Sequence, residues 1–194
     1  MPLLSPTKQT DLATMQDLFS LFESHLGFVP NSLKIMARRP QMLEAFAGFT
    51  YHVMAMSQLD ESLKSLVCWA ASAAHGCRYC QAHTFHAAKK SGMETQKITA
   101  LPEFETSAYF TAAERAAMVF AQCMAHGSNM IAQAEKDALQ QYYTEDEIFD
   151  IVSLVSYFGF LNRWNDTLET PIEAEPAKLA DTHLPGWDAG KHGS

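Results

Sequence analysis

The sequence lacks several features that mark specialised classes of protein. No apolar run approaches the roughly 20 residues that a membrane-spanning helix needs. Lys and Arg number 14 against 22 Asp and Glu, and the resulting net charge of -8 argues against a nucleic-acid surface. Residues 1–10 lack a basic region followed by an apolar one, so they predict no secretory signal. These absences predict a cytoplasmic protein with neither a membrane nor a nucleic-acid partner.

Cysteine is scarce, with four among 194 residues, and only Cys77 and Cys80 stand close together. This usage suits a reducing compartment better than a scaffold held by disulfides. Cys68 and Cys123 lie in apolar stretches with helical spacing, so we expect both to be buried and structural.

The alternation of apolar and polar residues that marks a strand is also absent. Apolar side chains instead recur at helical spacing, which predicts an all-α protein. We expect a single domain over residues 1–194, with a core at about 11–168. From residue 169 prolines accumulate and apolar residues thin out, which predicts an extended C-terminal arm over 169–194. The expected helices cover residues 11–27, 33–39, 40–54, 60–75, 77–91, 94–101, 111–125, 132–143 and 144–165.

Polar residues before several of these helices predict where they begin. Asp11 is expected to cap the first helix. The stretch from Ser57 to Asp60 resembles a capping box for the helix at 60–75. Thr111 matches a second capping box, and Thr144 opens the last long helix.

The stretch from Cys77 to Thr84, CRYCQAHT, carries the clearest chemical signal. Gly76 predicts a sharp break between two helices, which places the cysteine pair at a helix N-terminus. The helix dipole favours a thiolate there and lowers thiol pKa values. His83 lies one turn beyond Cys80 and can accept its proton or stabilise its thiolate. The pattern therefore predicts a redox dithiol that closes into a disulfide.

Two other interpretations of this stretch remain open. Both cysteines can be inert residues that pack as small apolar side chains. A metal site can form from Cys77, Cys80, His83 and a residue from elsewhere, and His86 extends the series of candidate ligands. Zinc needs four tetrahedral ligands, which successive turns of one helix cannot supply, and no second cysteine pair is present. We therefore predict no metal.

An alanine-rich helix, the motif GCRYCQAHT and the later LNRWN together resemble the carboxymuconolactone decarboxylase-like superfamily. Over residues 25–192 the chain looks most like its AhpD-like (alkylhydroperoxidase) branch. The resemblance implies an AhpD-like helical bundle that assembles as a homo-oligomer. It also implies a thiol peroxidase that reduces a hydroperoxide, forms a Cys77–Cys80 disulfide and is reset by an external dithiol. No cofactor beyond that disulfide is implied.

The resemblance assigns further residues by position. Cys77, Cys80 and His83 match the redox pair and the motif histidine, and His86 can share the role of His83. The family's proton-relay glutamate falls at Ser65. In its place Glu61, one turn earlier on the same face, is the expected carboxylate.

We expect Cys80 to attack the peroxide, with His83 as its base. Cys77, nearer the helix start and expected to be more exposed, then resolves the sulfenic acid and meets the reductant. The helix dipole alone would instead favour Cys77 as the thiol of lower pKa. The other histidines, among them His75 and His192, are interpreted as surface or satisfied residues.

The substrate pocket is expected to draw on residues near the motif and on the LNRWN stretch, with plain core packing as the alternative. The candidates are Tyr79, Trp69, Asn162, Arg163 and Trp164. Two other functions remain open, a lyase or isomerase like the lactone decarboxylase and a non-enzymatic redox-sensing oligomer.

Overall fold

The structure, a computed structural model, describes residues 2–7 and 15–193. Within these ranges every regular element is helical, which confirms the all-α prediction. The expected cap Asp11 lies outside the described residues. The elements are α1 (Gln16–Leu26), α2 (Asn31–Met36), α3 (Pro40–Thr50), the π-helical turn η2 (Tyr51–Ala55), α4 (Glu61–His75), α5 (Arg78–Lys90), α6 (Thr95–Thr99), η3 (Leu101–Glu103), α7 (Ala112–Gly127), η4 (Ser128–Met130), α8 (Gln133–Tyr142), α9 (Glu145–Leu168), α10 (Ala174–His183) and η5 (Gly190–His192).

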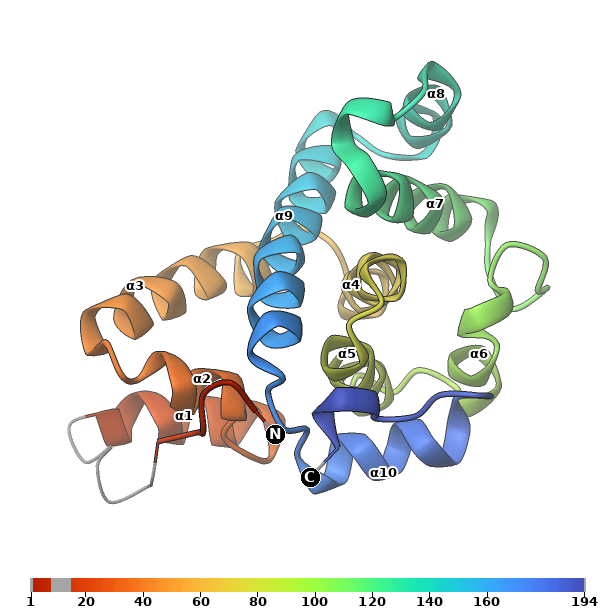
Figure 1. Cartoon of the computed structure of the whole chain (residues 1–194). Helices are drawn as coiled ribbons and strands as arrows, with labels where there is room; N and C mark the ends of the chain where they lie inside the picture. The colour runs from red at the N-terminus through yellow and green to blue at the C-terminus, as the bar shows by residue number, and fades with distance from the viewer. Residues whose placement is uncertain (1, 8–14, 194) are drawn as a thin grey trace.

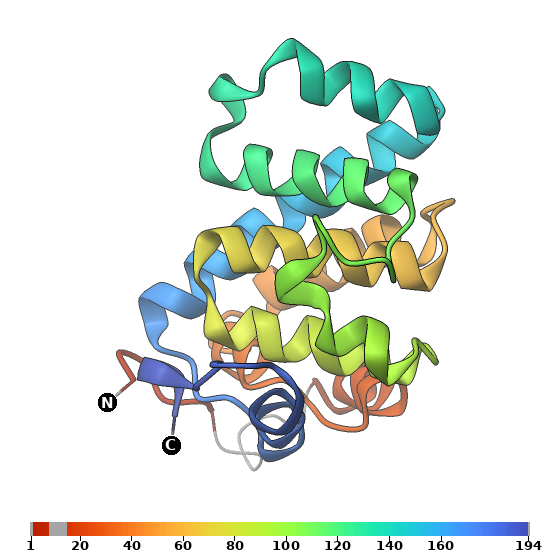
Figure 2. The ribbon, with the colours of Figure 1, turned by 90° about the vertical axis from the view of Figure 1, so that its right-hand side faces the viewer.

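The helices stack in successive layers around α4. Figure 2 shows α8, α7, α4 and α5 one beneath another, with α10 below α5, and each neighbouring pair is in contact. The long helix α9 contacts α4, α5 and α7, and in Figure 1 it separates α3 from α4. None of the helices in the described residues is long and apolar enough to cross a membrane.

Helix α4 forms the centre of this stack because its sequence is apolar on nearly every side. Leu66, Ala70 and Ala71 are 0% exposed, and the small side chains let neighbouring helices approach closely. The start of the helix differs from the prediction. Asp60 is the N-cap, and its Oδ1 accepts a hydrogen bond from the Leu63 N–H at 2.8 Å. Ser57 instead donates to the Asp150 carboxylate on α9, so no capping box forms there.

The two other N-terminal signals are confirmed. Thr111 forms a complete capping box with Glu114 at the start of α7. Thr144 does the same with Glu147 at the start of α9. Both boxes satisfy backbone N–H groups that have no partner within the helix. Cys68 is buried as expected, whereas Cys123 on α7 is only partly buried.

The C-terminal residues differ most from the prediction. The supposed extended arm contains α10, which packs on α5 of the same chain, and the short helix η5. Pro176 lies in the first turn of α10, where its missing N–H removes no helical hydrogen bond. The Ile172 N–H donates to the His192 carbonyl at 3.0 Å, and His192 is 0% exposed. This segment therefore belongs to the core of its own chain.

Candidate functional site

The cysteine pair lies at the predicted break between two helices. Gly76 ends α4 in the left-handed conformation, with φ 74°, which glycine adopts without steric strain. Cys77 follows as the N-cap of α5, and Cys80 lies in the first turn. Both thiols are free, and both are buried, with Cys77 0% and Cys80 2% exposed. The expectation that Cys77 is the exposed member is wrong, because the C-terminal segment covers it.

The pKa values of the two thiols are shifted in opposite directions. The Cys80 thiol donates a hydrogen bond to Cys77, and with contributions from His192 and the Cys80 backbone N–H this lowers the pKa of Cys77 to about 6. Burial raises the pKa of Cys80 well above its usual value, and the neighbouring Cys77 raises it further. Asn165 on α9 donates from Nδ2 to Cys80 Sγ at 3.6 Å. Of the two thiols, Cys77 is therefore the one that ionises more readily.

His192 of η5 is the histidine that contacts the pair, through a hydrogen bond with Cys77. Its Nδ1 lies 2.9 Å from the Thr170 carbonyl and its Nε2 lies 3.4 Å from Asp166 Oδ1. Burial alone would lower its pKa, but the bonds to Cys77, Thr170 and Asp166 outweigh burial and raise it. Sequence reasoning missed this residue, since no spacing rule links His192 to the distant motif.

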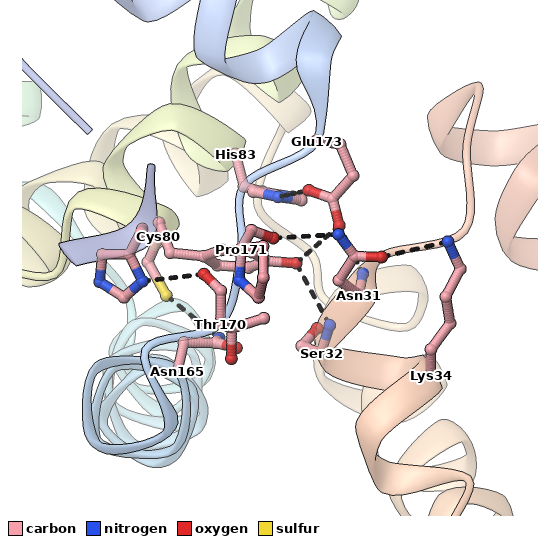
Figure 3. A network of polar contacts seen from close by, with 11 residues as sticks. Asn31, Ser32, Lys34, Cys80, His83, Asn165, Thr170, Pro171 and Glu173 are labelled. Atoms are coloured by element: carbon pink, nitrogen blue, oxygen red, sulfur yellow. Dashed lines mark hydrogen bonds and ion pairs between the residues drawn. The ribbon is translucent and has the colours of Figure 1, made fainter. Parts of the chain in front are cut away.

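His83 has a different partner from the one expected. Its Nε2 lies 2.6 Å from Glu173 Oε2, and its ring stacks on Tyr79 with centroids 4.2 Å apart. In Figure 3 the His83 ring points toward Glu173, whereas the Cys80 sulfur points toward Asn165. Within the described residues, His83 thus hydrogen-bonds a carboxylate rather than either cysteine.

Glu173 is the carboxylate that the sequence did not reveal. It accepts hydrogen bonds from the Asn31 backbone N–H, from the Tyr79 hydroxyl at 3.1 Å and from His83. Burial would raise its pKa, but the adjacent His83 and these hydrogen bonds lower it. The carboxylate that hydrogen-bonds the motif histidine therefore belongs to the segment between α9 and α10.

The other expected catalytic residues, Glu61, Ser65 and His86, have partners other than the cysteines. Glu61 has a largely exposed side chain and pairs with Lys64 Nζ at 2.5 Å. Ser65 donates to the Glu61 carbonyl at 2.9 Å, within its own helix. His86 lies 3.4 Å from the exposed Glu175, and burial lowers its pKa. The hydrogen bonds and ion pairs of these three residues thus go to groups other than the two cysteines.

A cavity of about 530 Å³ opens beside Cys80, between α1, α3, α4, α5 and α9. Its lining is largely apolar and includes Phe22, Phe46 and Leu161, whereas Cys77 does not line it. The polar groups beside Cys80 are His83, Tyr79, Thr84 and Asn165, and Glu61, Lys64 and Ser65 line the cavity along α4. Of the two sulfur-bearing residues of the pair, Cys80 thus lines the cavity and Cys77 does not.

Of the expected pocket residues, only Tyr79 lines this cavity. Trp69 is part of the core, at 5% exposure, and Asn162 is 1% exposed. Arg163 is exposed and donates to the Gly159 carbonyl at 2.9 Å, while Trp164 stacks on Phe160. Consecutive helical residues differ in direction by about 100°, so the LNRWN stretch cannot face one cavity with all its side chains.

The helical fold is AhpD-like, and comparisons with known proteins identify the family. Residues 40–123 match the Carboxymuconolactone decarboxylase family. The solved structure of the apo debrominase Bmp8 shares 32% sequence identity, with a TM-score of 0.85 over 92% of this chain and 96% of that one. The chain belongs to the carboxymuconolactone decarboxylase family.

Two further structures are similar. A cysteine-to-alanine variant of Bmp8 in complex with 2,3,4-tribromopyrrole shares 31% identity, with a TM-score of 0.87 over 94% of this chain and 97% of that one. An uncharacterised peroxidase-related protein from Ralstonia eutropha JMP134, described as an alkylhydroperoxidase AhpD core, shares 22% identity. Its TM-score of 0.78, over 91% of this chain and 95% of that one, shows the same fold. No curated protein sequence gives a significant match.

Proposed function

We propose that the protein is a thiol-dependent peroxidase that reduces organic hydroperoxides through Cys80 and Cys77. The observation that carries this proposal is the arrangement of the two sulfurs. Cys80 lines an apolar cavity, whereas Cys77, three residues away and the thiol of lower pKa, does not line it. A buried dithiol of this kind can store two electrons as a disulfide.

The reaction begins when the Cys80 proton passes to Cys77. The Cys80 thiolate attacks the terminal oxygen of the hydroperoxide, the O–O bond breaks, and the leaving alkoxide takes the proton from Cys77 and departs as the alcohol. Cys77, now a thiolate again, attacks the sulfenic sulfur of Cys80. The S–S bond forms, and the displaced hydroxide takes a proton from a neighbouring acid and leaves as water. An external dithiol then reduces the disulfide and is itself oxidised to a disulfide.

The cavity also favours an organic substrate over hydrogen peroxide. Most of its lining is apolar, so the hydrophobic effect favours binding of a carbon-rich substituent there. Asn165 Oδ1 is buried and has no hydrogen-bond partner among the described residues. It can accept the O–H of a hydroperoxide beside Cys80. Because Cys77 is fully buried, the external dithiol would enter through the same cavity and attack Cys80.

A second candidate, reductive dehalogenation, is favoured by the similarity to the debrominase Bmp8. In that reaction the Cys80 thiolate attacks the halogen of a carbon–bromine bond. The carbon keeps the bonding electrons and takes a proton. Cys77 then displaces bromide from Cys80, and the same disulfide forms. Both candidates use one two-electron dithiol and differ only in the bond that is reduced.

A substrate panel with an excess of dithiothreitol separates the candidates. Cumene hydroperoxide and 2,3,4-tribromopyrrole would be supplied in parallel, and the alcohol and bromide products would be measured. We expect alcohol formation that is lost in Cys80→Ser and unchanged in Cys123→Ser, a control thiol on α7. Bromide release without alcohol formation would favour the dehalogenase. If neither product forms, both proposals are wrong, and the lyase or isomerase and the redox-sensing oligomer move ahead.

The order of the two cysteines needs its own test. In Cys77→Ser, one equivalent of hydroperoxide should leave a sulfenic acid on Cys80 that a dimedone probe traps. In Cys80→Ser, no trapped species should form on Cys77, because Cys77 does not line the cavity. A trapped species on Cys77 alone would reverse the proposed order.

A further inference from the structure

The proposed chemistry needs a group that accepts and returns protons at a buried site. The motif histidine His83 is already bonded to Glu173, at 2.6 Å. His192, by contrast, lies beside the pair: a nitrogen of its ring, Cys77 Sγ and an Asp166 carboxylate oxygen lie within 4.8 Å of one another. It belongs to η5, the last helical turn of the chain, and is 0% exposed.

The surroundings of His192 fix which nitrogen faces the thiol. A backbone carbonyl can only accept a hydrogen bond, so the Thr170 carbonyl at 2.9 Å requires a proton on Nδ1. In the neutral ring the lone pair is then on Nε2. The reactive atoms of Cys77, Asp166 and His192 all lie within 4.8 Å of one another. Because Nδ1 is held by the Thr170 carbonyl, Nε2 is the nitrogen left to exchange a proton with Cys77.

Asp166 supplies a negative charge to the ring without competing for the thiol. Its Oδ1 lies 3.4 Å from His192 Nε2, and its Oδ2 pairs with Lys191 at 2.9 Å. The other ionisable groups that face the ring are Cys77 and Tyr79, whose ring centroid lies 6.1 Å away. An imidazolium at His192 would thus be flanked by a thiolate and a carboxylate, which both stabilise it.

We propose that His192, and not the motif histidine His83, is the acid–base residue of the dithiol. His192 Nε2 takes the Cys77 proton in the resting protein, while the Thr170 carbonyl holds Nδ1. When Cys77 attacks the sulfenic acid on Cys80, the imidazolium gives this proton to the departing hydroxide, which leaves as water. The proposal rests on the dithiol function above, and it makes the C-terminal segment a part of the site.

The test measures Cys77 alone, in a Cys80→Ser background where a hydroxyl replaces the second thiol and can still donate to Cys77. The ionisation of Cys77 would be followed against pH through its thiolate ultraviolet absorbance, with the Cys77→Ser, Cys80→Ser double variant as the blank, because no reagent then has to reach the buried sulfur. Adding His192→Gln should raise the pH midpoint of Cys77 ionisation by about one unit or more. His183→Gln, on α10 and stacked on Phe85, is the matched control and should leave the midpoint unchanged.

The same measurement on a variant of the motif histidine, His83→Gln, gives the result that would contradict the proposal. If His83→Gln raises the Cys77 midpoint and His192→Gln does not, the proposal is wrong. The assay uses neither peroxide nor organohalide, so it can succeed even where both proposed substrates fail. Failure of the proposed function and failure of this inference are thereby distinguished.

A second measurement keeps His192 in place, so it tests the proposal even if the His192→Gln protein does not fold. The imidazole of His192 would be titrated by NMR in the wild-type protein and in Cys77→Ser, a change of one atom. Loss of the thiolate should lower the His192 midpoint by about one pH unit, because the ion pair is gone. An unchanged midpoint would overturn the proposal.

Discussion

At the scale of single residues, the C-terminal segment supplies a partner to each reactive side chain. Glu173 holds His83, and His192 contacts Cys77. His192 is buried and the Glu173 side chain is only 11% exposed, so their interactions are screened less by solvent than surface pairs are. Changes at these positions should alter both stability and reactivity.

Glu173→Gln tests the first of these contacts. The pKa of Glu173 is lowered in the folded protein, so its carboxylate stabilises the fold above about pH 4.3, the usual value of an unfolded glutamate. This stability is lost as the pH falls through the lowered pKa. At pH 7 we expect the variant to lose about 1–3 kcal/mol, because a buried anion with three donors is removed. The measurement is urea unfolding at pH 7 and at pH 3.

The control for this experiment is Glu175→Gln. Glu175 is a neighbouring glutamate, on α10, with a mostly exposed side chain. Its loss should change the free energy of unfolding by no more than about 0.5 kcal/mol. Equal effects of the two variants at pH 7 would contradict the role given to Glu173.

The pH dependence of oxidation tests the charge on the cysteine pair. The hydrogen bond from Cys80 lowers the pKa of Cys77 to about 6. Because Cys77 must be ionised to accept the Cys80 proton and to resolve the sulfenic acid, disulfide formation should speed up as the pH rises through about 6 and then level off. Stopped-flow tryptophan fluorescence at fixed hydroperoxide concentration measures this rate. A first rise only above pH 8 would contradict the assignment.

The reactive cysteines could be predicted from the sequence, but their partners could not. Cys77 and Cys80 stand three positions apart at the start of one helix, so local spacing places them together. Glu173 and His192 come from a distant segment, and only tertiary packing brings them to the pair. The family resemblance also favoured Glu61, because it lies one turn before Ser65 on the same helix face, yet its side chain is largely exposed and pairs with Lys64.

At the scale of elements, the turn between α4 and α5 positions the site. Gly76 takes φ 74° there, and Cys77 then begins α5 in an extended conformation. The position of this turn was predictable because glycine interrupts an otherwise continuous helical pattern. The helix α10 was not predicted, since its proline suggested a break, although a proline in a first turn is compatible with a helix.

Two glycine substitutions should have opposite effects. Gly76→Ala forces a side chain into the left-handed region and should destabilise the fold by about 1–2 kcal/mol. Gly48→Ala, within α3, places a Cβ in open space and should stabilise it by about 0.5–1 kcal/mol. Thermal unfolding of both variants measures these changes. Destabilisation by Gly48→Ala equal to that by Gly76→Ala would contradict the account of this turn.

At the scale of the whole molecule, the chain closes on itself through its C-terminal segment. Helix α9 crosses the stack that runs from α8 to α10 (Figures 1 and 2). The cysteine pair lies at the start of α5 within this stack and is buried. The family likeness was predictable from the motif and the helical pattern together. The packing of the last residues was not, because few apolar residues mark that segment in the sequence.

The homo-oligomer implied by the family resemblance remains a prediction. Phe49 on α3 and Phe160 on α9 are 50% and 39% exposed, on elements joined through Phe46 and Tyr157. Light scattering should give a mass that is a multiple of 21.6 kDa, and Phe49→Glu should reduce it. Met130→Glu, at a distant and equally apolar exposed residue, should leave the mass unchanged. A single-chain mass for the wild-type protein would contradict the prediction.

The redox role of the Cys77–Cys80 pair is tested most directly by counting and mapping thiols. The reduced protein would receive one equivalent of cumene hydroperoxide, and its free thiols would be alkylated and mapped by mass spectrometry. We predict that two of the four thiols disappear, that a peptide carries a Cys77–Cys80 disulfide, and that dithiothreitol restores both. If Cys77 and Cys80 both remain alkylatable after the peroxide is added, the pair is not a peroxide-reducing dithiol.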